Sequence, residues 1–268
     1  LARFEREVRS TAKLSHWNNI DIFDYGSTED GTFYYVMEYL PGMNLEQLVL
    51  MNGSLPARRV IHLLTQVCDA LREAHESGLI HRDIKPANIF AAHRGGVFDV
   101  AKLLDFGLAR PMSSINDKGL THEGSITGSP LFTSPEQAVG DVADERSDIY
   151  SLGAVAWWML TGQPLFDNEN PLKILVAHAT ETPGSLTELA PDVPVELANI
   201  VMRCLEKSPD HRFQSARDLR HALLSCDVAI RWTAQDAEQW WQCHGCPDKK
   251  KLDAQVFAHA AGSPVAVE

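Results

Sequence analysis

The sequence contains no apolar run long enough to cross a lipid bilayer. Its longest strongly apolar stretch, from Leu152 to Leu160, falls well short of the roughly 20 residues that a transmembrane helix needs. An initiator methionine and a secretory signal peptide are also missing, because Leu1 opens directly into a charged helical pattern. We therefore expect no membrane span in this chain, and we interpret it as a fragment of a longer protein.

An excess of positive charge is missing too. The 268 residues include 24 lysine and arginine residues against 36 aspartate and glutamate residues, which gives a formal net charge of -12. This balance does not favour broad attraction to nucleic acid or to an anionic membrane. The short run Lys249–Lys251 does not change that expectation, so any bound phosphate needs a local site.

Cysteine is scarce, and its number is odd. Three of the five cysteines stand alone among apolar residues, namely Cys68, Cys204 and Cys226. Such thiols are expected to be reduced and buried, which favours a cytoplasmic location over an oxidising compartment. Cys243 and Cys246 flank His244, but a structural zinc site needs four ligands and no second pair lies nearby. We expect no metal at that position.

Patterns of apolar residues divide the chain into a small mixed part and a larger helical part. An amphipathic helix is expected from Phe4 to Leu14. Strands at 20–25 and 32–40 flank a turn-forming segment at 26–31, which predicts a hairpin, and Pro41-Gly42 then ends the second strand. Helices are expected at 45–51, at 56–77 and from 147 to 224, with short strands at 89–92 and 100–104.

The composition changes after Leu224. Three of the six tryptophans lie beyond it: Trp232, Trp240 and Trp241. Thr233 followed by Asp236 matches a helix-capping box, so a short helix to about Cys243 is expected in this tail. The last two tryptophans are predicted to dock that helix onto the larger part.

The segment His81–Asn88 concentrates the groups that phosphoryl transfer needs. An acceptor hydroxyl requires a carboxylate that orients it and accepts its proton, the transferred group requires charge neutralisation, and a metal ion requires hard oxygen ligands. Asp83, Lys85 and Asn88 suit these tasks in that order. Further along, Asp105 ends an apolar strand, and together with Asn88 it makes a candidate Mg²⁺ site.

These motifs resemble the signature set of protein kinases. The loop His81–Asn88, the triplet Asp105-Phe106-Gly107 and the triplet Ser134-Pro135-Glu136 follow in the kinase order, and Lys85-Pro86 is similar to the serine/threonine form. The resemblance implies an α+β, bilobal fold with a small, partial, β-rich N-lobe and a larger, mainly helical C-lobe. It also implies transfer of the γ-phosphoryl group of ATP, with Mg²⁺, to proteins. Ser134–Ala138 looks most like bacterial receptor-type, eukaryotic-like kinases.

The resemblance implies a nucleotide site as well. Glu7 would pair with an ATP-positioning lysine, and Met37 would be the gatekeeper of a hinge. The backbone carbonyl of Glu38 and the backbone amide of Leu40 would bond adenine, and Phe90 would lie under its ring.

Other residues match structural or regulatory positions of the family. Asp148 would brace the catalytic loop, His81 would pack under Phe106, and Glu136 would pair with Arg212. Candidate phosphorylation sites lie in the polar segment before Ser134, and they are Thr121, the first choice, then Ser125 and Thr127.

The Gly-rich loop and the strand lysine of the family are absent from the sequence, so the chain resembles an N-terminally truncated catalytic domain. The expected divisions are 1–40 for the remainder of the N-lobe, 41–224 for the C-lobe and 225–268 for a partly helical or disordered tail. Expected partners are protein substrates, and self-association for autophosphorylation is a further expectation. The chief alternative is a non-catalytic pseudokinase or scaffolding module, and a small-molecule phosphotransferase of related fold is a third possibility.

Overall fold

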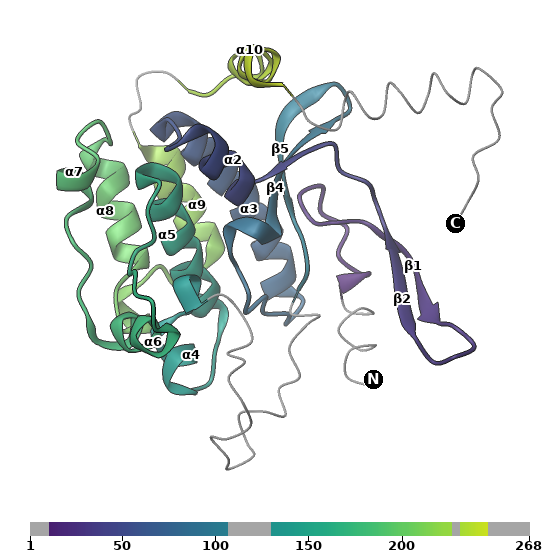
Figure 1. Cartoon of the computed structure of the whole chain (residues 1–268), viewed down its shortest axis with the longest axis horizontal. Helices are drawn as coiled ribbons and strands as arrows, with labels where there is room; N and C mark the ends of the chain where they lie inside the picture. Colours follow the sequence, from purple (N-terminus) through teal and green to yellow (C-terminus); the bar gives the residue numbers. More distant parts are fainter. Residues whose placement is uncertain (1–10, 107–129, 227–230, 246–268) are drawn as a thin grey trace.

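The computed structural model of the chain describes residues 11–106, 130–226 and 231–245. Figure 1 shows a two-stranded hairpin on one side and a helical body on the other, with a second, three-stranded sheet between them. The expected bilobal α+β architecture is confirmed. No helix in the described ranges is long and apolar enough to span a membrane.

The hairpin consists of β1 (Ile22–Ser27) and β2 (Phe33–Met37), which pair in antiparallel fashion with Tyr25 opposite Tyr35. The predicted hairpin is therefore confirmed. The second strand ends at Met37 rather than at residue 40, although the Glu38 N–H still donates to the Asp21 carbonyl, and residues 38–41 lead toward the next sheet.

The second sheet has the order β3 (Gly42–Asn44), β4 (Ile89–Arg94) and β5 (Val97–Leu103). Sequence patterns did not predict β3, because three residues are too few for a periodic signal. Gly42 pairs with Ala92 at a φ of 143°, and a Cβ added there would lie 2.3 Å from the carbonyl oxygen of Ala91. Only glycine fits this close approach, so Gly42 begins a strand where the sequence suggested a break.

The helical body begins directly after β3. Asn44 caps α2 (Leu45–Asn52) by accepting the backbone N–H of Gln47 at 2.8 Å, and the amphipathic α3 (Ala57–Glu76) follows. The remaining helices of the body are α4 (Pro135–Val139), α5 (Glu145–Thr161), α6 (Pro171–Thr180), α7 (Leu186–Leu189), α8 (Val195–Cys204) and α9 (Ala216–Ser225).

Helix α5 forms the centre of the body. Almost every residue from Ser147 to Leu160 is buried, so the helix is covered on all sides rather than on one face. At Gly153 it approaches α8 so closely that an added Cβ would lie 2.6 Å from the Cβ of Cys204. This buried helix carries Asp148, which reaches the loop His81–Asn88 described below.

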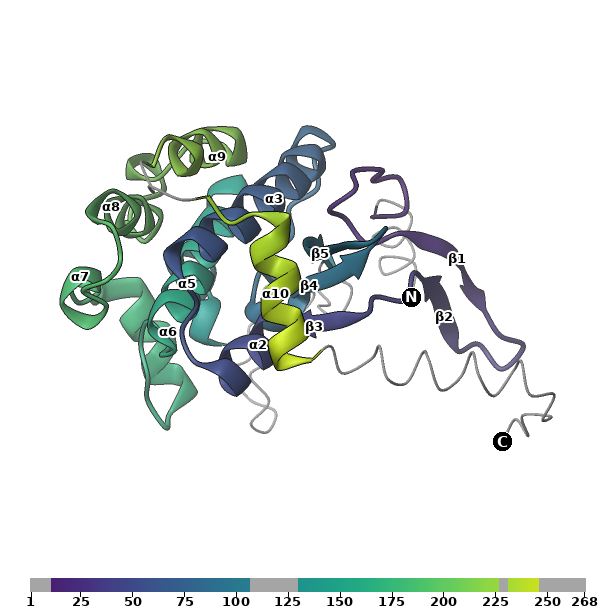
Figure 2. The same cartoon turned by 90° about the horizontal axis from the view of Figure 1, so that it is seen from above.

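The tail helix α10 (Ala234–His244) begins at the predicted cap, where Thr233 and Asp236 form a capping box. Seen from above in Figure 2, it lies across the molecule beside the three-stranded sheet, and it packs on β5. Trp241 is buried and Trp240 is partly buried against the main core. The expected docking of the tail helix is confirmed.

Candidate active site

The candidate active site centres on the turn that joins α3 to β4. Its last residues form a short 3-10 helix, Pro86–Asn88, directly before β4. Lys85 Nζ donates to Asp83 Oδ2 at 2.8 Å, and Asn88 Nδ2 donates to the same oxygen at 3.2 Å and to the Asp83 carbonyl at 2.9 Å. The structure therefore brings the predicted carboxylate, ammonium and amide together around one oxygen atom.

The backbone of the loop is held in place by the side chain of Asp148 on α5. Its two carboxylate oxygens accept the backbone N–H groups of His81, at 2.9 Å, and of Arg82, at 2.8 Å. Arg82 adopts a φ of 65°, a left-handed conformation that is costly for a non-glycine residue. Bonds from a buried helix to two successive amides hold that conformation, which confirms the bracing role predicted for Asp148.

His81 is structural, as the sequence predicted. The backbone N–H of Asp83 donates to His81 Nδ1 at 3.2 Å, so Nε2 carries the proton, which it donates to the Leu104 carbonyl at 2.8 Å. Burial lowers the pKa of the imidazole, and the ring centroid lies 4.7 Å from that of Phe106. The ring therefore links the loop His81–Asn88 to the segment that contains Asp105.

Asp105 directly follows a residue, Leu104, whose backbone is hydrogen-bonded to Asn88. The N–H of Leu104 donates to the Asn88 carbonyl at 2.9 Å, directly beyond the pair formed by Ile89 and Leu103. The side-chain nitrogen of Asn88 is bonded to Asp83, so the side-chain oxygen of Asn88 is the atom that could bind a metal ion. Asp105 would supply a carboxylate. Mg²⁺ binds through one or two such protein oxygens together with substrate phosphates, and this donor set fits that ion.

Tyr35 on β2 is a neighbour of Asp105 that the sequence did not indicate. Its hydroxyl donates to Asp105 Oδ1 at 3.5 Å, a long bond. Burial, together with the adjacent carboxylate, raises the pKa of this phenol. No motif marks Tyr35, because the contact depends on how the hairpin lies against the larger part.

The predicted hinge residues divide into two groups. Leu40 is buried in a small cluster against which Phe90 packs, so these two predicted adenine contacts lie together. Met37, at the end of β2, is exposed on the hairpin. The side chain of Glu38 points to Lys102 and Arg94, two basic residues that the sequence patterns did not connect with the hinge.

Several predicted residues lie outside the described ranges, and these are Glu7, Thr121, Ser125 and Thr127. Their predicted roles therefore remain predictions.

The predicted pair of Glu136 and Arg212 is confirmed. Arg212 Nη1 and Nη2 donate to Glu136 Oε1 and Oε2, each at 2.8 Å, and the hydroxyl of Ser147 donates to Oε1 at 2.6 Å. Burial alone would raise the pKa of Glu136, but the hydrogen bonds from Arg212 and Ser147 lower it to about 2. The pair joins α4, α5 and the segment before α9.

This pair predicts a defined acid sensitivity. The pKa of Glu136 falls on folding from 4.5 to about 2, so its contribution to stability is present above pH 4.5 and is lost as the pH falls toward 2. The contribution is on the order of 3 kcal/mol. Urea unfolding at several pH values should show that the difference in free energy of unfolding between the native chain and Glu136→Gln becomes smaller as the pH falls over that range. The same difference for the exposed variant Glu46→Gln should not change in this way. If the difference for Glu136→Gln did not depend on pH, the role assigned to the Glu136–Arg212 pair would be contradicted.

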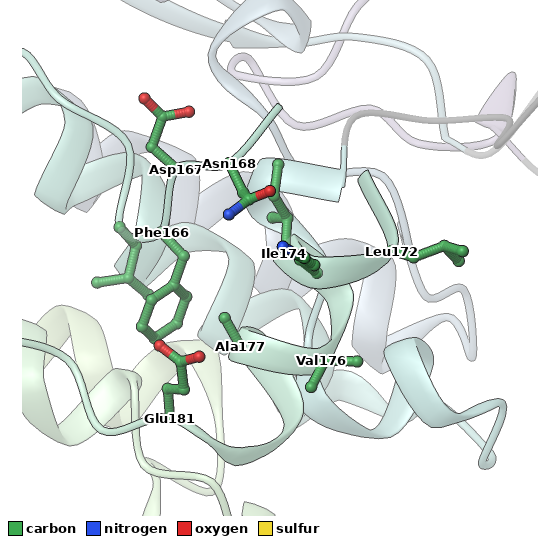
Figure 3. A pocket seen from close by; sticks show the side chains of 10 residues that line it. Phe166, Asp167, Asn168, Leu172, Ile174, Val176, Ala177 and Glu181 are labelled. Atoms are coloured by element: carbon green, nitrogen blue, oxygen red, sulfur yellow. The ribbon is translucent and has the colours of Figure 1, made fainter. Parts of the chain in front are cut away.

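The structure also contains a cavity of about 470 Å³ away from these residues, between the loop after α5 and helix α6. Figure 3 shows Phe166 beside the carboxylate of Glu181, with Ile174 nearer to Asn168, among the side chains that line the cavity. None of the predicted phosphoryl-transfer residues lines it. The candidate active site is therefore defined by its converging side chains and not by this cavity.

The sequence is similar to that of known protein kinases over most of its length. The family model described as "Protein kinase domain" matches residues 2–239. The chain is 37% identical over 234 residues to serine/threonine-protein kinase pkn3 of Myxococcus xanthus, covering 86% of the chain and 43% of that protein. It is 38% identical over 219 residues to PrkC of Bacillus subtilis, with 82% and 33% covered. It is 37% identical over 225 residues to PknB of Mycolicibacterium smegmatis, with 83% and 35% covered. The chain spans less than half the length of these relatives.

Proposed function

Because the chain belongs to the protein kinase family, we propose that it is the greater part of the catalytic domain of a serine/threonine kinase. The reaction is transfer of the γ-phosphoryl group of MgATP to a Ser or Thr hydroxyl of a protein. The observation that carries this proposal is the convergence of Lys85 and Asn88 on the carboxylate of Asp83, beside Asp105. The names of the bacterial relatives, all serine/threonine kinases, support a role in bacterial signalling.

Each group in the site has a defined task in this proposal. Asp83 orients the acceptor hydroxyl and receives its proton as the new oxygen–phosphorus bond forms. Lys85, held 2.8 Å from that carboxylate, neutralises charge on the transferred group. Asn88 and Asp105 would hold Mg²⁺, which when bound with ATP supplies charge neutralisation at the phosphates. Asp148 fixes the backbone of the loop that carries Asp83 and Lys85.

The nucleotide and regulatory assignments are part of the same proposal. Adenine would bind the backbone of Glu38 and Leu40 over Phe90, next to Met37, and Glu7 would orient the lysine of an upstream strand. The packing of Phe90 on the cluster that contains Leu40 supports this placement.

We further propose the division into an N-lobe remainder at 1–40, a C-lobe at 41–224 and a tail at 225–268. Proteins are the proposed substrates, with a second copy of the kinase as the partner in autophosphorylation and no nucleic-acid partner. The buried free thiols Cys68 and Cys204 suit a reducing compartment, which supports a cytoplasmic site of action.

Autophosphorylation tests the proposal directly. Full-length protein incubated with MgATP is expected to acquire phosphate on Thr121 first, with Ser125 and Thr127 as the other acceptors. Arg82, beside Asp83, would receive the phosphate through charge-assisted hydrogen bonds. Phosphopeptide mapping of active protein that left Thr121 unmodified would reject this site. Protein that gained no phosphate at all while binding partner proteins would support a pseudokinase.

A further inference from the structure

Strand β5 carries a fully buried lysine whose ammonium group faces the hinge. Lys102 Nζ donates to the Asn19 carbonyl at 2.9 Å and forms an ion pair with Glu38 Oε1. A buried lysine is costly unless it is paired with an opposite charge and hydrogen-bonded. This lysine therefore has its specific partner on the segment that connects the hairpin to the larger part.

The carboxylate of Glu38 is held from several directions. Oε1 also accepts the backbone N–H of Asp21 at 3.0 Å, and Oε2 pairs with Arg94. Arg94 in turn donates to Asp21 Oδ2 at 3.0 Å, so two basic and two acidic side chains form one neutral cluster. We call these four residues, Asp21, Glu38, Arg94 and Lys102, the hinge clamp. They come from β5, from β4 and from the two ends of the hairpin.

The hinge backbone is thereby fixed at both ends of a three-residue stretch. At one end the Glu38 N–H donates to the Asp21 carbonyl at 2.9 Å, and its side chain is bound in the clamp. At the other end Leu40 is buried in the small cluster against which Phe90 packs. The backbone carbonyl of Glu38 and the backbone amide of Leu40 lie within this stretch, so their positions depend on both anchors.

We propose that Lys102 is a positioning residue for adenine, acting through the side chain of Glu38. This inference rests on the proposed function, because it assumes that adenine binds the hinge backbone. Lys102 lies three residues before Asp105. The strand β5 therefore contacts the hinge through Lys102 and leads directly to the proposed metal ligand Asp105. Neither Lys102 nor Arg94 touches the nucleotide in this account.

The clamp also predicts how binding varies with pH. Burial, with a smaller contribution from nearby Arg94, lowers the pKa of Lys102 to about 8, although Asp21 opposes that shift. The ammonium form holds Glu38, so the clamp is intact below pH 8 and weakens as the pH rises through that value. Glu38 and Asp21 are the carboxylates that face the lysine, and the guanidinium group of Arg94 pairs with the same two carboxylates.

The test is the affinity of the full-length protein for ADP and for inorganic tripolyphosphate, each with Mg²⁺, by isothermal titration calorimetry. Lys102→Met should weaken ADP binding roughly tenfold, as for the loss of one well-placed hydrogen bond, and leave tripolyphosphate binding unchanged. The weakening of ADP binding to the native chain above pH 8 should disappear in this variant. The double variant Lys102→Met/Glu38→Gln should lose no more ADP affinity than the weaker-binding of the two single variants, because both substitutions break the same contact.

Lys207→Met is a matched control. Lys207 is another lysine whose pKa burial lowers to about 8, but it donates to the His178 carbonyl at 2.8 Å, far from the hinge in sequence and contacts. It should lower thermal stability without changing ADP affinity. If Lys102→Met does not fold, Arg94→Met opens the clamp on its solvent side and should also weaken ADP binding while leaving tripolyphosphate binding unchanged. Unchanged ADP affinity in the folded clamp variants would overturn the inference alone. A native full-length protein that binds neither ADP nor tripolyphosphate would overturn the proposed function with it.

Discussion

Asp83→Asn is expected to lower the rate constant for phosphoryl transfer by the full-length protein by roughly 10²–10⁴-fold, the usual contribution of a general base. The amide cannot accept the proton of the attacking hydroxyl. It keeps the size of the carboxylate and retains an oxygen that can accept from Lys85, so the loop should stay folded. The KM for ATP should therefore change little while kcat falls, as measured by steady-state transfer to a protein substrate.

The control for this variant is Asp192→Asn, which removes the same charge at an exposed position before α8. It should behave like the native protein in both kcat and thermal stability. An Asp83→Asn protein with more than about a tenth of the native kcat would contradict the general-base role. A fall in kcat that is accompanied by a clear fall in melting temperature would instead indicate a structural role for Asp83.

Asp99→Asn is expected to destabilise the chain by about 3–5 kcal/mol, the usual result of removing one partner from a buried ion pair. Asp99 and Arg59 are both fully buried, and their side chains form two hydrogen bonds of 2.8 Å. The same carboxylate accepts the indole N–H groups of Trp232, at 2.8 Å, and Trp241, at 2.7 Å. An asparagine offers one acceptor oxygen and turns an amide donor toward groups that are themselves donors.

The loss should extend to the tail, because Asp99 connects the tail segment to β5. Arg59 also lies 3.9 Å from the ring centroid of Trp240, so the ion pair is covered by α10. Asp99 has a φ of 56°, and asparagine tolerates this left-handed conformation, which separates the electrostatic effect from backbone strain. Thermal unfolding should show a fall in melting temperature of roughly 6–20 °C.

Asp69→Asn provides the comparison at the surface. Asp69 pairs with Arg220 at 2.8 Å, but both side chains are partly exposed. Such pairs contribute at most about 1 kcal/mol. If Asp99→Asn proved no more destabilising than Asp69→Asn, the tail helix would not depend on the buried pair.

The sequence predicted those parts of the fold whose information is local. The hairpin, α3 and α10 each carry a periodic pattern or a cap within a short window, as Thr233 and Asp236 illustrate. The strand β3 escaped prediction because its three residues are defined by a close approach of Gly42 to a strand almost fifty residues later.

The candidate site divides in the same way. Asp83, Lys85 and Asn88 lie within six residues, so one motif contains them all and their convergence could be predicted. The partners of Glu38 could not, because Lys102 and Arg94 reach it only after the two sheets are assembled. Arg59 appeared as one polar residue in an amphipathic helix, and nothing local connects it to Asp99 or to the tail tryptophans. Long-range buried charges are the features that sequence patterns did not indicate.

The central claim is that this chain belongs to an enzyme that phosphorylates serine or threonine. The measurement that tests it most directly is transfer of ³²P from γ-³²P-ATP to casein, followed by phosphoamino-acid analysis. The 268-residue chain and the full-length protein should be compared, each with its Asp83→Asn variant. We predict labelled phosphoserine or phosphothreonine from the full-length protein, abolished by Asp83→Asn. A full-length protein that transfers no label while still binding partner proteins would contradict the claim and identify a pseudokinase.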